Sequence, residues 1–119
     1  MANAFVHTEL NTQDVGKAKA FYGKLFDWKL EDMAGGMEYT LIKVGENTAG
    51  GIMQHPMPGA PSMWLSYVNV DDIKSSTAKA KSLGATLIRD VTEIPNVGWF
   101  SIFTDPTGAM LALFQAKMQ

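Results

Sequence analysis

The chain reads Asp14-Val15-Gly16-Lys17-Ala18-Lys19-Ala20-Phe21-Tyr22 directly after a strand-like segment, Val6–Leu10. Asp14 suits the position before the first turn of a helix, and the apolar residues that follow it recur at helical spacing. The same order returns 58 positions further on, where Asp72-Ile73 follows the strand-like segment Trp64–Val70. Each half then closes on an apolar segment that begins with glycine. This repetition predicts two copies of one structural unit, with a site between the copies.

Hydrophobic periodicity predicts the same order of elements, βαβββ, in both halves. In the first half we expect a helix over 14–26, a turn at 33–37, and strands near 5–11, 28–32, 38–44 and 49–54. In the second half we expect a helix over 72–83 and strands near 63–70, 85–91, 98–104 and 109–115. Three prolines in the segment 55–62 forbid a continuing helix, so this segment joins the units, about 5–54 and 63–115, of a single domain, 1–119.

Composition excludes several classes of function. The chain has 119 residues, a net charge of −2 and no cysteine. A small negative net charge does not indicate the basic surface that nucleic-acid binding needs. No apolar run approaches the roughly 20 residues that span a bilayer. The absence of cysteine excludes disulfides, thiolate metal sites and a cysteine nucleophile. The first residues, Met1–Phe5, lack the features of a signal peptide, so we expect a cytoplasmic protein.

The repeated βαβββ order, Ala-x-x-Phe-Tyr at 18–22 and Thr-Asp-Pro-Thr-Gly at 104–108 resemble the vicinal-oxygen-chelate superfamily. That group includes glyoxalase I, bleomycin-resistance proteins and extradiol dioxygenases, and this chain is most similar to its small glyoxalase-like members. The resemblance covers about residues 5–115. It implies an α+β fold in which two tandem βαβββ units form curved mixed sheets around a cleft, with the helices outside. The two motifs are a helix packing face and a hairpin turn, so they indicate the fold and not the reaction.

The resemblance also implies where a metal ion would bind. Metal-using members hold a divalent ion with four ligands from equivalent strand positions, which are His7, Gly51, Leu65 and Ala112 in this chain. Only His7 has a donor atom, and stable sites need three or four protein ligands. We therefore expect no metal and no other cofactor. One alternative stays open, in which Glu9 and His55 join His7 to recruit a divalent ion.

Strand alternation places His7, Glu9 and Asn11 on one face of the first strand. The candidate ligand-binding residues all face the predicted cleft; they are His7, Glu9, Asn11, Leu65, Tyr67, Asn69, Met53, Met110, Ala112 and Phe114. An imidazole and a carboxylate on one face can form an acid/base pair, or they can simply satisfy each other's hydrogen bonds. Tyr67 can bind a ligand or pack. The methionines can line an apolar pocket or fill the core.

Three functions follow from these candidates. The first is a glyoxalase- or bleomycin-resistance-like protein that binds a small, partly apolar organic molecule between the units without the family metal. The second is a lyase or isomerase of a small oxygenated substrate, with His7 and Glu9 as catalytic residues and a divalent metal as an option. The third is an accessory domain for dimerisation. For all three we expect a homodimer, because members of this superfamily often pair copies of the unit. We expect neither nucleic acid nor a membrane as a partner.

Overall fold

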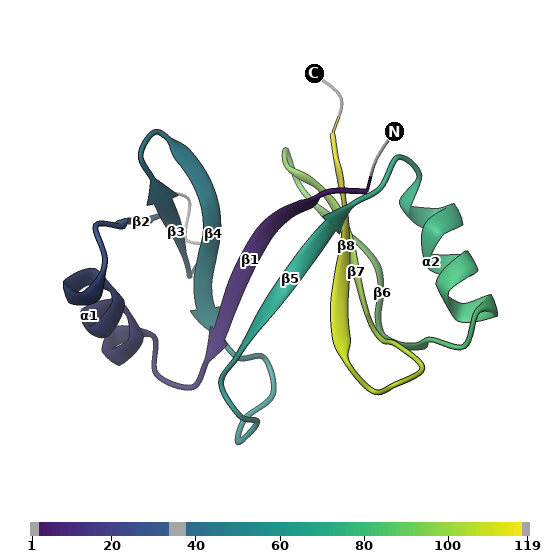
Figure 1. Ribbon diagram of the computed structural model, residues 1–119, viewed down its shortest axis with the longest axis horizontal. Helices are drawn as coiled ribbons and strands as arrows, with labels where there is room; N and C mark the ends of the chain where they lie inside the picture. Colours follow the sequence, from purple (N-terminus) through teal and green to yellow (C-terminus); the bar gives the residue numbers. More distant parts are fainter. Residues whose placement is uncertain (1–2, 34–37, 118–119) are drawn as a thin grey trace. The chain divides into compact units, whose positions relative to one another are not determined.

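A computed structural model describes residues 3–33 and 38–117. Over these described residues the predicted element order is confirmed, with two helices and eight strands (Figure 1). In chain order the elements are β1 (Phe5–Thr12), α1 (Val15–Leu25), β2 (Lys29–Asp32), β3 (Tyr39–Val44), β4 (Asn47–Gln54), β5 (Met63–Asn69), α2 (Ile73–Ser82), β6 (Thr86–Ile94), β7 (Gly98–Thr104) and β8 (Met110–Ala116). The turn expected at 33–37 lies, apart from Met33, outside the described residues.

The chain divides into two compact units. The first unit is His7–Leu65, and the second unit combines Met1–Val6 with Ser66–Gln119. Each contains one helix and a mixed sheet, so the predicted α+β class and the repeat are confirmed. A cleft between the units stays a prediction from the sequence.

In the first unit the strands follow the order β2-β3-β4-β1. β1 pairs in parallel with β4, while the other two pairs are antiparallel. α1 covers one face of this sheet (Figure 1). The core on that face consists of Leu10, Ile42 and Ile52, of which Ile52 is completely buried. Apolar side chains of α1 and its flanking strands pack against it; they are Val15, Ala18, Tyr22, Trp28 and Leu30.

In the second unit the order is β5-β8-β7-β6, again with one parallel pair, β5 with β8. α2 covers one face, and the core there is formed by Val70, Ile73 and Leu113. A buried hydrogen bond of 2.8 Å between the hydroxyls of Thr77 and Ser101 joins α2 to β7. The two units therefore share one plan: a mixed sheet with a helix on one side, which leaves the other face of each sheet to carry the candidate site residues.

The ends of the helices follow the sequence signals. The carboxylates of Asp14 and Asp72 accept backbone N–H groups of Lys17 and Ser75, at 3.0 and 3.1 Å. Both are therefore N-caps, as predicted for Asp14, and each satisfies a donor that the first turn leaves unpaired. Gly84 follows α2 with φ of +105°, a left-handed conformation that glycine adopts without strain.

In the part of the chain that the structure describes, neither helix is long and apolar enough to cross a bilayer.

The capping role gives a test of the fold that is independent of function. Asp72→Ala is expected to lower the free energy of unfolding by about 1 kcal/mol, because Ser75 N–H loses its acceptor. Urea denaturation at fixed pH measures the change. Asp71→Ala removes the same charge one residue before the capping position and serves as the control. Equal losses in the two variants would show that charge, and not capping, is responsible.

Candidate functional site

The alternation of β1 separates its side chains between the two faces of the first unit's sheet. Leu10 belongs to the core beneath α1, so His7, Glu9 and Asn11 lie on the opposite face. The parallel pairing with β4 sets Glu9 beside Gly51 and Asn11 beside Met53. β3 continues both rows, with Leu41 next to Gly51 and Tyr39 next to Met53. This face therefore combines polar residues from β1 with a tyrosine from β3; we call it the polar face.

Three side chains on the polar face form a hydrogen-bonded chain. The phenolic oxygen of Tyr39 lies 2.7 Å from Nε2 of His7. The same phenol donates to Oε2 of Glu9, at 2.8 Å. The imidazole and the phenol ring are stacked, with an angle of 22° between their planes. We call these three residues the His7–Tyr39–Glu9 cluster.

Gly51 makes room for this cluster. A Cβ atom added to Gly51 would lie 2.0 Å from the phenolic oxygen of Tyr39 and 2.1 Å from the ring carbon that bears it. Both distances are far below van der Waals contact. The phenol thus occupies the space that any side chain at position 51 would need. Glycine at this position is a condition for the two hydrogen bonds of Tyr39.

Burial gives the cluster its electrostatic character. Glu9 is only 7% exposed, as is Asn11. Burial of a carboxylate costs free energy unless hydrogen bonds replace the lost water, and Tyr39 supplies one such bond. Burial also lowers the pKa of His7 below its usual 6.5, because desolvation disfavours the charged imidazolium. The imidazole is therefore neutral at pH 7.

The remaining candidates are divided between the two units. Leu65 and Met53 belong to the first unit, where Leu65 is 2% exposed and Met53 is half-buried. In the second unit, register pairs Tyr67 with Ala112 and Asn69 with Phe114, on one face of that sheet. Tyr67 and Ala112 are buried, whereas Met110 at the start of β8 is exposed. The structure thus brings together His7 and Glu9, and separately the group on β5 and β8.

His55 lies in the linker and has a local structural role. Its Nδ1 accepts the backbone N–H of Met57, at 3.0 Å. The side chain of Gln13 holds the same loop by donating to the carbonyls of Met57 and Ala60, at 3.0 and 2.8 Å. Over residues 3–33 and 38–117, no three His, Asp or Glu side chains gather as metal ligands would. His55 therefore does not join His7 and Glu9 in this structure.

Sequence reasoning missed Tyr39. The residue stands in a correctly predicted strand, and an aromatic side chain there reads as an ordinary packing residue. Its place beside His7 and Glu9 depends on the parallel register between β1 and β4, which the local sequence does not state. One signal was available: two glycines in a row, Gly50-Gly51, in the middle of a predicted strand indicate close approach by another group.

A model of the Glyoxalase/Bleomycin resistance protein/Dioxygenase superfamily matches residues 4–113. The chain belongs to this superfamily. Among curated relatives, the Mycobacterium bovis protein named "Putative glyoxylase CFP32" is 35% identical over 116 residues. The match covers 96% of this chain and 44% of that protein, so the chain spans less than half the length of this relative.

Solved structures confirm the superfamily fold. A hypothetical protein, BH1468, from Bacillus halodurans C-125 superposes with a TM-score of 0.71 at 14% identity, covering 100% of this chain and 98% of that chain. The Mn(II)-bound glyoxalase from Novosphingobium aromaticivorans superposes with a TM-score of 0.62 at 16% identity, covering 99% of this chain and 43% of that chain. At these identities the likeness concerns the fold and not the ligands.

The lowered pKa of His7 predicts how stability depends on pH. Between the folded-state pKa and 6.5 the unfolded chain binds more protons than the folded chain. Stability therefore falls as the pH falls through this window. A pH titration of the histidine ring signals by NMR should give a midpoint below 6.5 for His7. The His7 signal is identified by its loss in His7→Gln. In urea denaturation, this variant should lose part of the pH dependence in the same window. A His7 midpoint at or above 6.5 would contradict the role of burial.

The contact between Tyr39 and Gly51 predicts a coupled pair of substitutions. Gly51→Ala should lower the free energy of unfolding by about 1–3 kcal/mol, because the new Cβ overlaps the phenol. In a Tyr39→Ala background the same substitution should lose most of this penalty. Gly16→Ala is the matched control, since beyond its chain neighbours and its own helix backbone the added Cβ would have only the Asp14 carboxylate oxygen within 4 Å, at 3.8 Å. An equal penalty with and without Tyr39 would show that the overlap is not the cause.

Proposed function

We propose that the polar face binds a small, partly apolar organic molecule through the His7–Tyr39–Glu9 cluster. The observation that carries the proposal is the pair of hydrogen bonds, 2.7 and 2.8 Å, that joins a buried carboxylate to an imidazole through a phenol. Ionisable groups buried together are costly to stability, and they concentrate at functional sites.

The neighbours of the cluster define the chemistry of the ligand. Leu41 and Met53 lie on the same face, in the rows of Glu9 and Asn11, and both are half-buried. They offer apolar contact beside the polar cluster. The imidazole of His7, the phenol of Tyr39 and the amide of Asn11 can donate hydrogen bonds to carbonyl or hydroxyl oxygens and accept hydrogen bonds from hydroxyl groups. A ligand with one oxygenated end and one apolar end therefore fits this face best.

We further propose that binding does not use the metal site of the superfamily. At the four family positions, Gly51 has no side chain and Leu65 and Ala112 have no donor atom. The phenol of Tyr39 fills the space beside Gly51, so a ligand side chain there would displace it. The donor set does not fit a four-ligand ion. The manganese named for the Novosphingobium glyoxalase is a property of that protein.

A second candidate function is a lyase or isomerase of a small oxygenated substrate, and one observation favours it. His7 and Glu9 lie on one face, both within hydrogen-bond distance of Tyr39, and general acid/base catalysis requires such groups close together at the substrate. His7 and Glu9 would then be the catalytic residues. The homodimer, the cytoplasmic location and the use of the chain as an accessory dimerisation domain stay predictions from the sequence.

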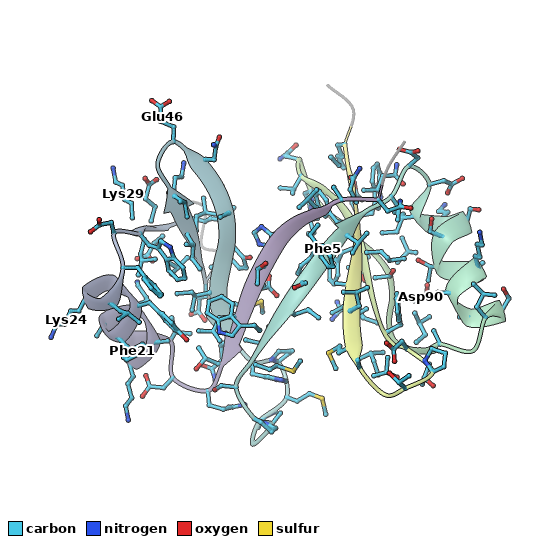
Figure 2. The ribbon with its side chains drawn as sticks, in the orientation of Figure 1. Phe5, Phe21, Lys24, Lys29, Glu46 and Asp90 are labelled. Atoms are coloured by element: carbon cyan, nitrogen blue, oxygen red, sulfur yellow. The ribbon has the colours of Figure 1, made fainter. Side chains whose placement is uncertain are left out.

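Ligand screening tests the binding function. Protein purified without a His-tag is screened by thermal shift against small aromatic and aliphatic carbonyl and hydroxyl compounds. At a ligand concentration 100 times the Kd, binding adds about 2.7 kcal/mol to the unfolding free energy, which raises Tm by about 5 °C or more. Glu9→Gln and Tyr39→Phe should each weaken binding of a hit about tenfold, through one lost hydrogen bond. Lys24→Ala is the control, because Lys24 points away from the sheet on α1 (Figure 2).

The same samples separate the alternatives. A hit that is bound without chemical change supports the binding protein, and a hit that is converted supports the enzyme. Metal analysis of the untreated protein should find no stoichiometric divalent ion. A full equivalent of metal that disappears in His7→Ala would overturn the metal-free proposal. A hit weakened equally by Lys24→Ala and Tyr39→Phe would place the ligand elsewhere.

A further inference from the structure

A groove lies between α2 and β6 in the second unit, on the helix side of the sheet. Its volume of about 400 Å³ is within the range of pockets that hold small molecules. The residues that line it are Lys74, Thr77, Ala78, Lys81, Asp90 and Val91. The four from α2 are spaced i, i+3, i+4 and i+7, so they form one stripe along the helix. We call this cavity the α2–β6 groove.

An irregularity in β6 brings a carboxylate to this groove. Asp90 and Val91 stand between two paired positions of β6 and β7, and together they oppose the single residue Ser101. Two residues opposite one form a β-bulge, which redirects side chains. Val91 packs against the core beneath α2, and Asp90 lines the same groove, between the sheet and the helix (Figure 2). In a regular strand these two neighbours would point to opposite faces.

Two ammonium groups border the groove without a carboxylate partner. In the part of the chain that the structure describes, neither Lys74 nor Lys81 forms an ion pair, with Asp90 or with any other acidic residue. Seven residues of helix rise about 10 Å, so the two lysines stand at the ends of the stripe. Two lysines against one aspartate give the lining residues a net charge of +1. The groove therefore attracts anions, and most strongly those with two charged ends.

A buried hydroxyl adds a neutral donor between the lysines. Thr77 is 3% exposed and lines the groove, and its hydroxyl lies 2.8 Å from the hydroxyl of the completely buried Ser101. Two hydroxyls have two hydrogens, and this contact uses one of them. When Ser101 is the donor, the hydrogen of Thr77 is left for an acceptor in the groove. An oxygen of a bound anion would supply that acceptor.

We propose that the α2–β6 groove binds a small dicarboxylate that also has a hydroxyl or amino group. Each ligand carboxylate pairs with one lysine, and Thr77 donates to a carboxylate oxygen. Asp90 accepts a hydrogen bond from the hydroxyl or amino group of the ligand. A dicarboxylate without such a group would meet Asp90 as an uncompensated like charge, so the groove discriminates against it. Every residue of this site belongs to the second unit, and none belongs to the polar face.

Titration of the ¹⁵N-labelled full chain with malate, aspartate and succinate at constant ionic strength tests the site. Malate or aspartate should shift the amide signals of Ala78 and Val91 along a saturating curve. The better of the two should bind about tenfold more tightly than succinate, which lacks a group that donates to Asp90. A preference for malate identifies a hydroxyl as the donor, and a preference for aspartate identifies an amine. If these signals do not shift, or if succinate binds as tightly, the proposal is wrong.

Variants assign binding to the groove. Lys74→Gln and Lys81→Gln should each weaken binding of the preferred ligand about threefold. Lys79→Gln removes the same charge from α2 outside the stripe and is the control. Asp90→Ala should weaken binding of that ligand and strengthen binding of succinate, because it removes both an acceptor and a repulsive charge. Such opposite responses cannot come from loss of the fold. Equal weakening by Lys79→Gln and Lys74→Gln, or equal responses of both ligands to Asp90→Ala, would overturn the proposal.

Discussion

The contact between the phenol of Tyr39 and the backbone of Gly51 is the constraint on which the polar face depends. The parallel pairing of β1 with β4 sets Gly51 beside Glu9, and the missing side chain leaves space above the sheet. Tyr39 reaches across from β3 into that space and meets His7 and Glu9. With any larger residue at position 51 the phenol would have to leave. The buried carboxylate would then lose its hydrogen bond from Tyr39.

Most of the fold could be predicted because its signals are local. Asp14 and Asp72 cap the helices that they were predicted to begin, and apolar spacing identified the faces that pack on the sheets. The main difference lies in β6, which continues to Ile94, beyond the predicted end at 91. Register shifts interrupt its pairing with β7 near Arg89, and such irregularities blur the alternation that marks a strand in the sequence.

The site was predictable only in part, for a physical reason. Alternation along β1 is a local property, so it placed His7 and Glu9 on one face. Tyr39 meets them only because β3 lies two strands away from β1, across β4, and its residues pair with β4 in one particular register. The short turn between β3 and β4 sets the register of that pair, but the parallel register of β1 with β4 is set by contacts between segments distant in the sequence. No feature of the strand's own sequence separates Tyr39 from a tyrosine that merely packs.

The repeat allows the polar cluster of the first unit to be compared with the equivalent positions of the second unit. Equivalent rows can be matched through register: Glu9 and Gly51 correspond to Tyr67 and Ala112, and Tyr39 corresponds to Phe100. The second unit thus keeps an aromatic ring where the first has Tyr39, but without the hydroxyl. The guanidinium of Arg89 lies 5.7 Å from the centre of the Phe100 ring, a contact with the ring face and not with a hydrogen-bonding oxygen. The two sheet faces therefore differ in the phenolic hydroxyl of Tyr39 and in the carboxylate of Glu9, and these groups form the hydrogen-bonded cluster with His7 in the first unit.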